Sequence, residues 1–186
     1  MISFLKGKLA EALPTQVVID VNGVGYEVLI PLSSFDKLPM PGGEVTLLTH
    51  LAIRDDAHVL YGFSTETERD LFRLLIRHVS GIGPKLALNV LSGTTPASFR
   101  AAVAHGDVKA LSCISGVGKK TAERIVVELK DKLGDETALT SGAAATADDQ
   151  KMADAISALI ALGSKPKDAQ DAIRAAGQWE YAKEIE

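Results

Sequence analysis

The sequence predicts an α+β protein made of several small domains, and three observations carry that prediction. Short β-branched runs with turn signals between them fill the first third of the chain. The middle has helical periodicity and contains one glycine motif twice, as VSGIGPKLALNV and ISGVGKKTAERI. A small, polar stretch then precedes a last helical segment. We expect a barrel domain at 1–63, a helical domain at 64–134, a flexible linker at 135–149 and a small helical domain at 150–186.

The first segment, 1–63, is typical of a small closed β-barrel of the OB type, with a fragment of a β-sandwich as the alternative. Asn22-Gly23 joins two β-branched runs, and this pair favours the positive φ angles of a hairpin turn. A second tight turn is expected at Asp55-Asp56. The five expected strands cover 2–12, 16–21, 25–30, 44–54 and 58–63.

Residues 64–134 are expected to form an all-α domain. Thr65 is a candidate N-cap, and Glu68 stands three residues later, where it completes a capping box. The apolar positions that follow recur at helical spacing. The expected elements are a helix with Leu71, Leu74, Leu75 and Val79 on its apolar face, helices at 84–91, 96–105 and 119–133, and a short turn near 108–111.

The last segment, 150–186, is expected to hold three short helices. These are a helix with Met152, Ile156, Leu159 and Ile160 on one face that ends at Gly163, a helix that begins at Pro166, and a helix at 179–185. A domain this small suits a protein-binding appendage better than a catalytic unit.

The net charge of −4 is distributed unevenly along the chain. Residues 1–62 carry four Lys or Arg and seven Asp or Glu, residues 63–134 carry eleven and seven, and residues 135–186 carry five and ten. The basic excess therefore lies in the segment with the repeated motif, which is where a polyanion is expected to bind.

The single cysteine, Cys113, lies in the apolar run Ala110–Ile114, so we expect a buried thiol and no disulfide within the chain. The N-terminus lacks the features of a signal peptide. No apolar run approaches the roughly 20 residues that span a bilayer. We expect a soluble cytoplasmic protein without a cofactor and without a membrane partner.

Each copy of the repeated motif reads small–Gly–hydrophobic–Gly–x–Lys, and a helix follows. The two glycines permit positive φ and leave out a Cβ, so that another backbone can approach closely. The apolar residue between them, Ile82 or Val117, is expected to point inward. The helix that follows presents unpaired N–H groups and the positive end of its dipole, and both attract a phosphate.

Three interpretations of this motif compete. A nucleotide P-loop is excluded, because Cys113 stands where its first glycine is needed and Lys120 stands where Ser or Thr must follow the lysine. Glycine turns with solvated lysines explain one copy well, but they explain two copies in the basic segment poorly. We favour a pair of helix-hairpin-helix elements, which hold DNA by its backbone phosphates and not by base identity. The expected DNA-binding residues are Gly81, Gly83, Lys85, Gly116, Gly118, Lys119, Lys120, Thr121 and Arg124.

Several segments occur in a recognisable order along almost the whole chain: VNGVGYEV, IRDDAHVLYGF, ERDLFRLLI, the two hairpins and ALIALGSKPKDAQDAI. This order resembles the bacterial RuvA family, the Holliday-junction-binding subunits of RuvAB branch-migration complexes. The resemblance implies an OB-fold first domain, a second domain with tandem helix-hairpin-helix motifs and a mobile third domain. It also implies a homotetramer, or an octamer of two stacked tetramers, that presents a four-fold basic surface to an open four-way junction.

The resemblance also implies partners. A RuvB-like hexameric ATPase is expected to contact the domain at 150–186, and a RuvC-like resolvase is expected in the same complex. Ser164 stands where many relatives have an aromatic residue, so the resemblance assigns no contact residues for the ATPase.

The turn Asp55-Asp56 has two interpretations from its residues alone: ordinary turn residues, or part of a metal nuclease centre with His58. A metal site needs further acidic ligands, and the sequence shows no recognisable set of them. In RuvA-like proteins this position carries an acidic pin at the centre of the tetramer, where carboxylates repel phosphates. Many relatives have Glu then Asp, and this chain keeps the charge with two aspartates. Arg54 is expected either to contact the junction or to pair with an aspartate.

The chain is expected to be non-catalytic by itself, with ATP hydrolysis in its partner, because it has no Walker motif. The alternative is a helix-hairpin-helix DNA repair enzyme, either a glycosylase or a structure-specific nuclease. Such a glycosylase places its catalytic aspartate in a Gly/Pro-Val-Asp context, which DKLGDETALT lacks. A DNA-independent adaptor is the third class.

Overall fold

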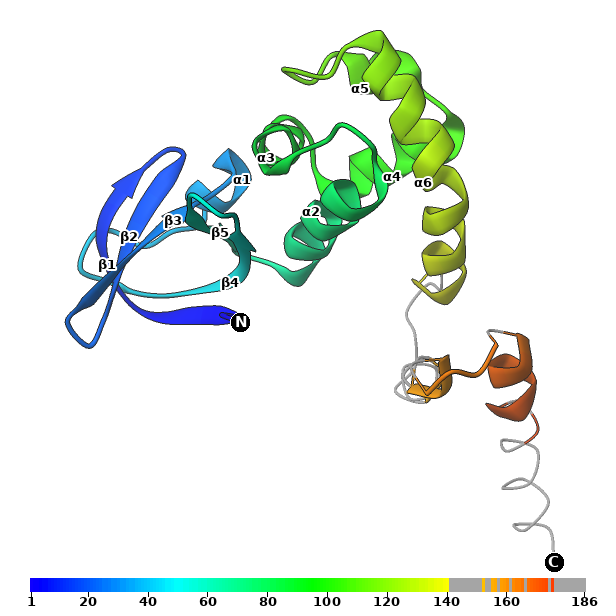
Figure 1. Ribbon diagram of the computed structural model, residues 1–186, viewed down its shortest axis with the longest axis horizontal. Coiled ribbons are helices and arrows are strands. Elements are labelled where there is room, and N and C mark those ends of the chain that lie inside the picture. The colour runs from blue at the N-terminus through cyan, green and yellow to red at the C-terminus, as the bar shows by residue number, and fades with distance from the viewer. Residues whose placement is uncertain are drawn as a thin grey trace, which may run out of the picture. The chain divides into compact units, whose positions relative to one another are not determined.

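The computed structural model of the chain describes residues 1–140 and, with gaps, residues 152–175. The chain divides into two compact units, Met1–Gly134 and Asp135–Glu186. Figure 1 shows the strands at the N-terminal end of the first unit and the helices that follow them.

Five strands close into a barrel in the order β1-β2-β3-β5-β4, with β4 pairing back onto β1 and β3 parallel to β5. This topology confirms the expected OB-type barrel and not the sandwich fragment. Alternate side chains of the strands point inward, and Leu9, Ile19 and Leu47 are almost fully buried. The strands are β1 (Phe4–Leu13), β2 (Gln16–Val21), β3 (Val24–Leu29), β4 (Glu44–Ile53) and β5 (His58–Phe63).

The connections of the barrel follow local turn chemistry. Asn22 and Gly23 have φ angles of 54° and 87°, as the predicted hairpin turn requires, and Asp20 Oδ1 accepts a hydrogen bond from the Gly23 N–H at 2.7 Å. The connection from β3 to β4 contains a four-residue helix, α1 (Leu32–Phe35), that the sequence did not predict. A single helical turn is too short for a periodic pattern to reveal it.

Five helices follow the barrel in the part of the chain up to residue 140, and four of them begin at the predicted residues, Glu66, Pro84, Pro96 and Lys119. Pro84 and Pro96 occupy the first turn of their helices, where the missing N–H costs nothing. The predicted capping box is present: Thr65 Oγ1 accepts from the Glu68 N–H, and the Thr65 N–H donates to the Glu68 carboxylate. The helices are α2 (Glu66–His78), α3 (Pro84–Gly93), α4 (Pro96–His105), α5 (Val108–Ser112) and α6 (Lys119–Thr140).

The helix α6 is longer than expected. It continues past the expected end at 133, so residues 135–140 of the expected linker are helical, while 141–149 lie outside the described residues. Glu136, Ala138 and Leu139 are good helix formers, and a single glycine at Gly134 is not sufficient to end a helix.

In the second unit, a helix ends at Gly163, as predicted. This residue has a φ of 98°, and the Ser164 N–H donates to the Leu159 carbonyl at 3.0 Å, which is the pattern of a Schellman motif. Residues 167–173 are helical, as expected after Pro166. The expected third helix at 179–185 lies outside the described residues.

The barrel and the helices of the first unit meet at Phe72. Its ring lies 4.9 Å from that of Phe63, 5.1 Å from Tyr61 and 5.4 Å from His50, measured between ring centroids. Phe63 and Phe72 are completely buried. Aromatic contacts of this kind add to the burial energy, so α2 is held firmly against β4 and β5.

Cys113 is exposed, and the expectation of a buried thiol is wrong. It stands at the C-terminal cap of α5, between Leu111 and Ile114, which both point into the core. An apolar run does not bury every member, because side chains on a helical turn fan out around its axis. No helix in the described part of the chain combines the length and the apolar character needed to cross a membrane.

Candidate nucleic-acid interface

The two glycine motifs form hairpins with the same backbone hydrogen bonds. The first hairpin, residues 79–83, joins α2 to α3, and the second hairpin, residues 114–118, joins α5 to α6. In both, the fifth residue of the hairpin, Gly83 or Gly118, directly precedes the first residue of the following helix. The equivalent N–H to carbonyl bonds are Ile82 to Val79 (3.1 Å) and Val117 to Ile114 (2.9 Å), then Ala87 to Gly83 (3.0 Å) and Ala122 to Gly118 (2.9 Å). The sequence repeat is therefore a structural repeat.

The first glycine of each hairpin is required by the backbone. Gly81 has a φ of 82° and Gly116 a φ of 84°, in the left-handed region where a side chain is strained. The apolar residue that follows is buried as predicted, with Ile82 at 5% and Val117 at 3% exposure. These two residues anchor each turn in the helical core.

The second glycine of each hairpin is not required by the fold. Neither Gly83 nor Gly118 has a positive φ, and a Cβ built on either would meet no atom within 4 Å. Gly83 is the N-cap of α3, and no side chain caps that helix. The glycines thus place no side chain beside the start of either helix, where first-turn N–H groups lack a partner within the helix. Space of this kind suits a phosphate group of a ligand.

The two glycines of the first hairpin should therefore respond differently to alanine. Gly81→Ala places a side chain at a positive φ and is expected to lower the free energy of unfolding by about 1–2 kcal/mol. Gly83→Ala is expected to change it little, because the poorer N-cap and the lower entropy of the unfolded chain oppose each other. Urea denaturation measures the stability. If Gly83→Ala instead destabilised the protein as strongly as Gly81→Ala, the glycine would have a folding role.

The lysines of the motif lie at the exposed starts of the two helices. Lys85 is in the first turn of α3, and Lys119 and Lys120 begin α6. Among the described residues, no acidic side chain pairs with any of the three. Thr121 is half-buried. Each hairpin thus combines free N–H groups, the positive end of a helix dipole and a mobile ammonium group.

Arg124 has a different environment from the one expected. Its Nη1 donates to the carbonyl oxygen of Ser80, in the first hairpin, at 2.7 Å. The guanidinium group is exposed, and Arg has five N–H donors, so this bond does not exhaust it. Arg124 therefore bridges the two hairpins before any ligand arrives.

The acidic turn joins the end of β4 to the start of β5. The Arg54 N–H donates to the Ala57 carbonyl at 2.9 Å and closes the turn. Arg54, Asp55 and Asp56 are all exposed, and within the described residues their side chains form no hydrogen bond or ion pair. The structure thus does not bring Arg54 together with either aspartate. No group of three or more His, Cys, Asp or Glu among the described residues is placed to hold a metal ion.

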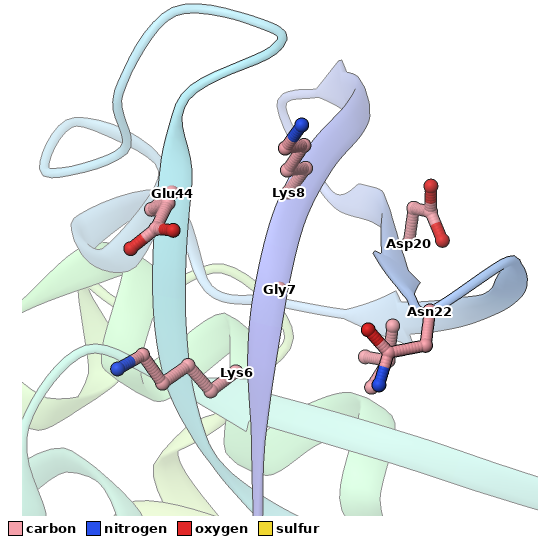
Figure 2. A pocket seen from close by; sticks show the side chains of 7 residues that line it. Lys6, Gly7, Lys8, Asp20, Asn22 and Glu44 are labelled. Atoms are coloured by element: carbon pink, nitrogen blue, oxygen red, sulfur yellow. The ribbon is translucent and has the colours of Figure 1, made fainter.

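A hollow of about 360 Å³ on the barrel is lined by two further cations, Lys6 and Lys8. Figure 2 shows Lys6 and Lys8 projecting from β1, with Glu44 on one side and Asp20 and Asn22 on the other. The opposite charges lie within the same hollow, so its attraction for a polyanion is weak. The hairpins are the better candidate site.

Three residues near the hairpins were missed by the sequence analysis. The Ser80 N–H donates to Glu128 Oε2 at 2.8 Å, so this carboxylate on α6 reaches the first hairpin. Gly116 lies close to Leu86 and Asn89 of α3. For Glu128, the signal in the sequence was its i, i+4 spacing from Arg124, and that spacing normally indicates an ion pair on one helix.

Comparison with known proteins identifies the two parts of this architecture. Residues 1–62 match the family model described as RuvA N terminal domain, and residues 72–131 match the SAM-like helix-hairpin-helix tandem. Relatives with the name Holliday junction branch migration complex subunit RuvA match the chain. The proteins of Thioalkalivibrio sulfidiphilus and Chromobacterium violaceum are both 51% identical to this chain, and that of Methylibium petroleiphilum is 50% identical.

These matches extend over nearly the whole of each protein. They cover 94% of this chain and 90%, 89% and 90% of the three relatives respectively. The barrel, the tandem hairpins and an identity near one half over this length all lead to one assignment: the chain belongs to the RuvA family.

Proposed function

We propose that this protein binds four-way DNA junctions through their backbone phosphates, with little preference for base sequence. One observation carries the proposal. Two equivalent hairpins each leave open space in front of a helix N-terminus, beside exposed lysines and at a glycine that the fold itself does not need. The names of the relatives support the junction as the ligand.

The proposed contacts fall into two groups. Backbone N–H groups near Gly81, Gly83, Gly116 and Gly118 receive phosphate oxygens, as helix N-termini do elsewhere. Lys85, Lys119, Lys120 and Arg124 supply positive charge, and Thr121 supplies a hydroxyl group. Contacts of this type fix the position of a duplex without reading its bases.

Four arms of a junction are best matched by four copies of the same surface. We propose a homotetramer, or an octamer, in which weak phosphate contacts from each subunit add up through avidity. The domain at 150–186 recruits a RuvB-like hexameric ATPase that supplies the energy for branch migration, and a RuvC-like resolvase joins the same complex. The chain hydrolyses no ATP itself and acts in the cytoplasm, where chromosomal junctions arise.

Asp55 and Asp56 are proposed to act at the crossover point of the junction, and Arg54 beside them contacts a nearby phosphate. The exposure of all three side chains supports this role, because their charged groups are accessible to an external partner. Negative charge at the crossover repels phosphates and favours separated strands over continuous duplex.

A competition experiment tests the proposed function. Labelled four-way junction is mixed with the protein and challenged with excess linear duplex of the same arm sequence, in Mg²⁺ at near-physiological salt. The proposal expects strong retention of the junction. Equal competition would reduce the protein to a general duplex-binding protein. Cleavage of either DNA by the pure chain would favour the repair-enzyme alternative.

Replacing both aspartates tests the acidic turn. In Asp55→Asn with Asp56→Asn, linear duplex should bind more tightly, because repulsion from two carboxylates is removed. We expect the preference for junction over duplex to fall by about tenfold, equivalent to roughly 1.4 kcal/mol. Asp36→Asn is the control, since Asp36 is an exposed aspartate elsewhere on the barrel. An unchanged preference in the double variant would remove the turn from the mechanism.

A further inference from the structure

The backbone of the first hairpin is held by two side chains of the helix that leaves the second hairpin. Arg124 Nη1 donates to the Ser80 carbonyl at 2.7 Å, and the Ser80 N–H donates to Glu128 Oε2 at 2.8 Å. Both polar groups of one peptide residue are thus satisfied by residues 44 and 48 positions away. Arg124 and Glu128 stand one helical turn apart on α6, on the same face.

The contact between the hairpins is reciprocal. The repeat aligns Asn89 of α3 with Arg124 of α6, just as it aligns Gly81 with Gly116. A Cβ on Gly81 would lie 2.9 Å from Arg124 Nη1, and a Cβ on Gly116 would lie 3.5 Å from Asn89 Nδ2. Each hairpin turn therefore packs against the helix that leaves the other hairpin.

We infer that Arg124 and Glu128 are positioning residues, which lock the two hairpins into one rigid unit with a fixed spacing between its phosphate sites. The inference rests on the proposed function. A rigid pair binds two phosphates of one duplex without first ordering the second site, so the entropic cost of binding is lower. Charge-assisted hydrogen bonds are strong enough to maintain such a unit.

Substitution of Glu128 tests this role, because two explanations predict opposite changes in the affinity for DNA. Simple electrostatics predicts that Glu128→Ala strengthens DNA binding, since a negative charge leaves a DNA-binding face. The positioning role predicts about tenfold weaker binding to linear duplex, through loss of a charge-assisted hydrogen bond. It also predicts an unchanged slope of log K against log salt concentration, because no phosphate-binding cation is removed.

Matched variants distinguish the positioning role from the effect of removing a negative charge from α6. Glu123→Ala removes the same charge from the same helix, and Glu123 is exposed with no partner among the described residues. It should bind duplex as tightly as the natural protein or more tightly. Glu128→Gln keeps an oxygen that accepts from the Ser80 N–H and should recover most of the affinity. Arg124→Lys keeps the charge but not the geometry, and should weaken binding with the salt slope unchanged.

Thermal melting followed by circular dichroism shows whether each variant is folded at the assay temperature. If Glu128→Ala is unfolded, the comparison of Arg124→Lys with the natural protein decides the question. Binding by Glu128→Ala or by Arg124→Lys at the natural affinity would overturn the inference. Failure of the natural protein to bind any DNA would instead overturn the proposed function.

Discussion

Reversing the charges of Lys119 and Lys120 is expected to abolish DNA binding. Both residues begin α6 at the second hairpin, are exposed and have no acidic partner among the described residues. Loss of two hydrogen bonds to charged groups costs about 3–6 kcal/mol, and added repulsion increases that cost. We expect the affinity of Lys119→Glu with Lys120→Glu for linear duplex and for junction to fall by at least about 100-fold.

The control for this variant is Lys6→Glu with Lys8→Glu. It makes the same change in net charge, but in the barrel hollow that also contains Asp20 and Glu44. Gel-shift titrations of both variants compare the hairpin with overall charge. A similar loss in both would mean that net charge alone governs binding. If Lys119→Glu/Lys120→Glu lost DNA binding but kept the activity of the natural protein, the adaptor class would be supported, because DNA binding plays no part in it.

A single neutral substitution gives a finer readout of the same contact. Lys120→Ala should weaken binding to every DNA sequence by a similar factor. It should also make the slope of log K against log salt concentration shallower by about one unit per binding subunit. This behaviour contrasts with Glu128→Ala, for which the slope is expected to stay constant. The two variants together distinguish phosphate contact from positioning.

Removing the carboxylate of Glu68 is expected to have the largest effect on stability. Glu68 is 2% exposed and lies where α1 meets the start of α2. It accepts hydrogen bonds from Ser33 Oγ at 2.9 Å and Ser34 Oγ at 3.1 Å, and Lys37 Nζ lies 3.3 Å away. The Thr65 N–H donates to it as well. One side chain thus connects the barrel to the helices.

Glu68→Ala leaves several buried or half-buried donors without an acceptor. We expect the free energy of unfolding to fall by about 2–4 kcal/mol, as measured by urea denaturation. Glu66→Ala is the control on the same helix turn. Glu66 is largely exposed and pairs with Arg69 at 3.6 Å, so its removal should cost less than about 0.5 kcal/mol. Equal losses in both variants would contradict the role of Glu68.

The pH dependence of stability offers an independent check on Glu68. Burial raises the pKa of this carboxyl, but hydrogen bonds from Ser33 and Ser34 and the charge of Lys37 outweigh burial, so the pKa is lowered from 4.5. A carboxyl with a lowered pKa stabilises the folded state above its usual pKa and loses that contribution as pH falls. The stability difference between the natural protein and Glu68→Gln should therefore shrink below about pH 4.5.

His50 adds a separate acid-sensitive contribution. Burial, followed by the positive charges of Arg73 and Arg77, lowers the pKa of His50 from 6.5. The neutral ring is therefore favoured in the folded protein, and stability is lost as pH falls below the usual value. This loss begins at higher pH than the one from Glu68 and is present in both proteins of the comparison, so the difference between them isolates Glu68.

Local features of the sequence were sufficient to predict most elements of the first unit. The Asn22-Gly23 turn, the capping box at Thr65 and the prolines at Pro84 and Pro96 each act through residues no more than four positions away. Such signals survive without tertiary context, because they satisfy backbone groups or set φ directly. The closed barrel followed from the close spacing of the strands.

Features that depend on how elements are placed against each other were not predictable in this way. The exposure of Cys113 depends on the rotation of α5 against the core, and the local apolar run wrongly predicted a buried thiol. The bonds of Glu68 to Ser33 and Ser34 join residues more than 30 positions apart. No local pattern encodes a contact that forms only after two elements have packed.

In the hairpins, too, some features follow from the local sequence and others from tertiary packing. The sequence by itself determined the two glycine turns, their lysines and the basic segment around them, because turn geometry and charge are properties of a few neighbouring residues. Only the tertiary structure decided that Arg124 holds Ser80, that Glu128 joins it, and that Gly83 and Gly118 face open space. These depend on the packing of α6 against the first hairpin, which brings together groups that are remote along the chain.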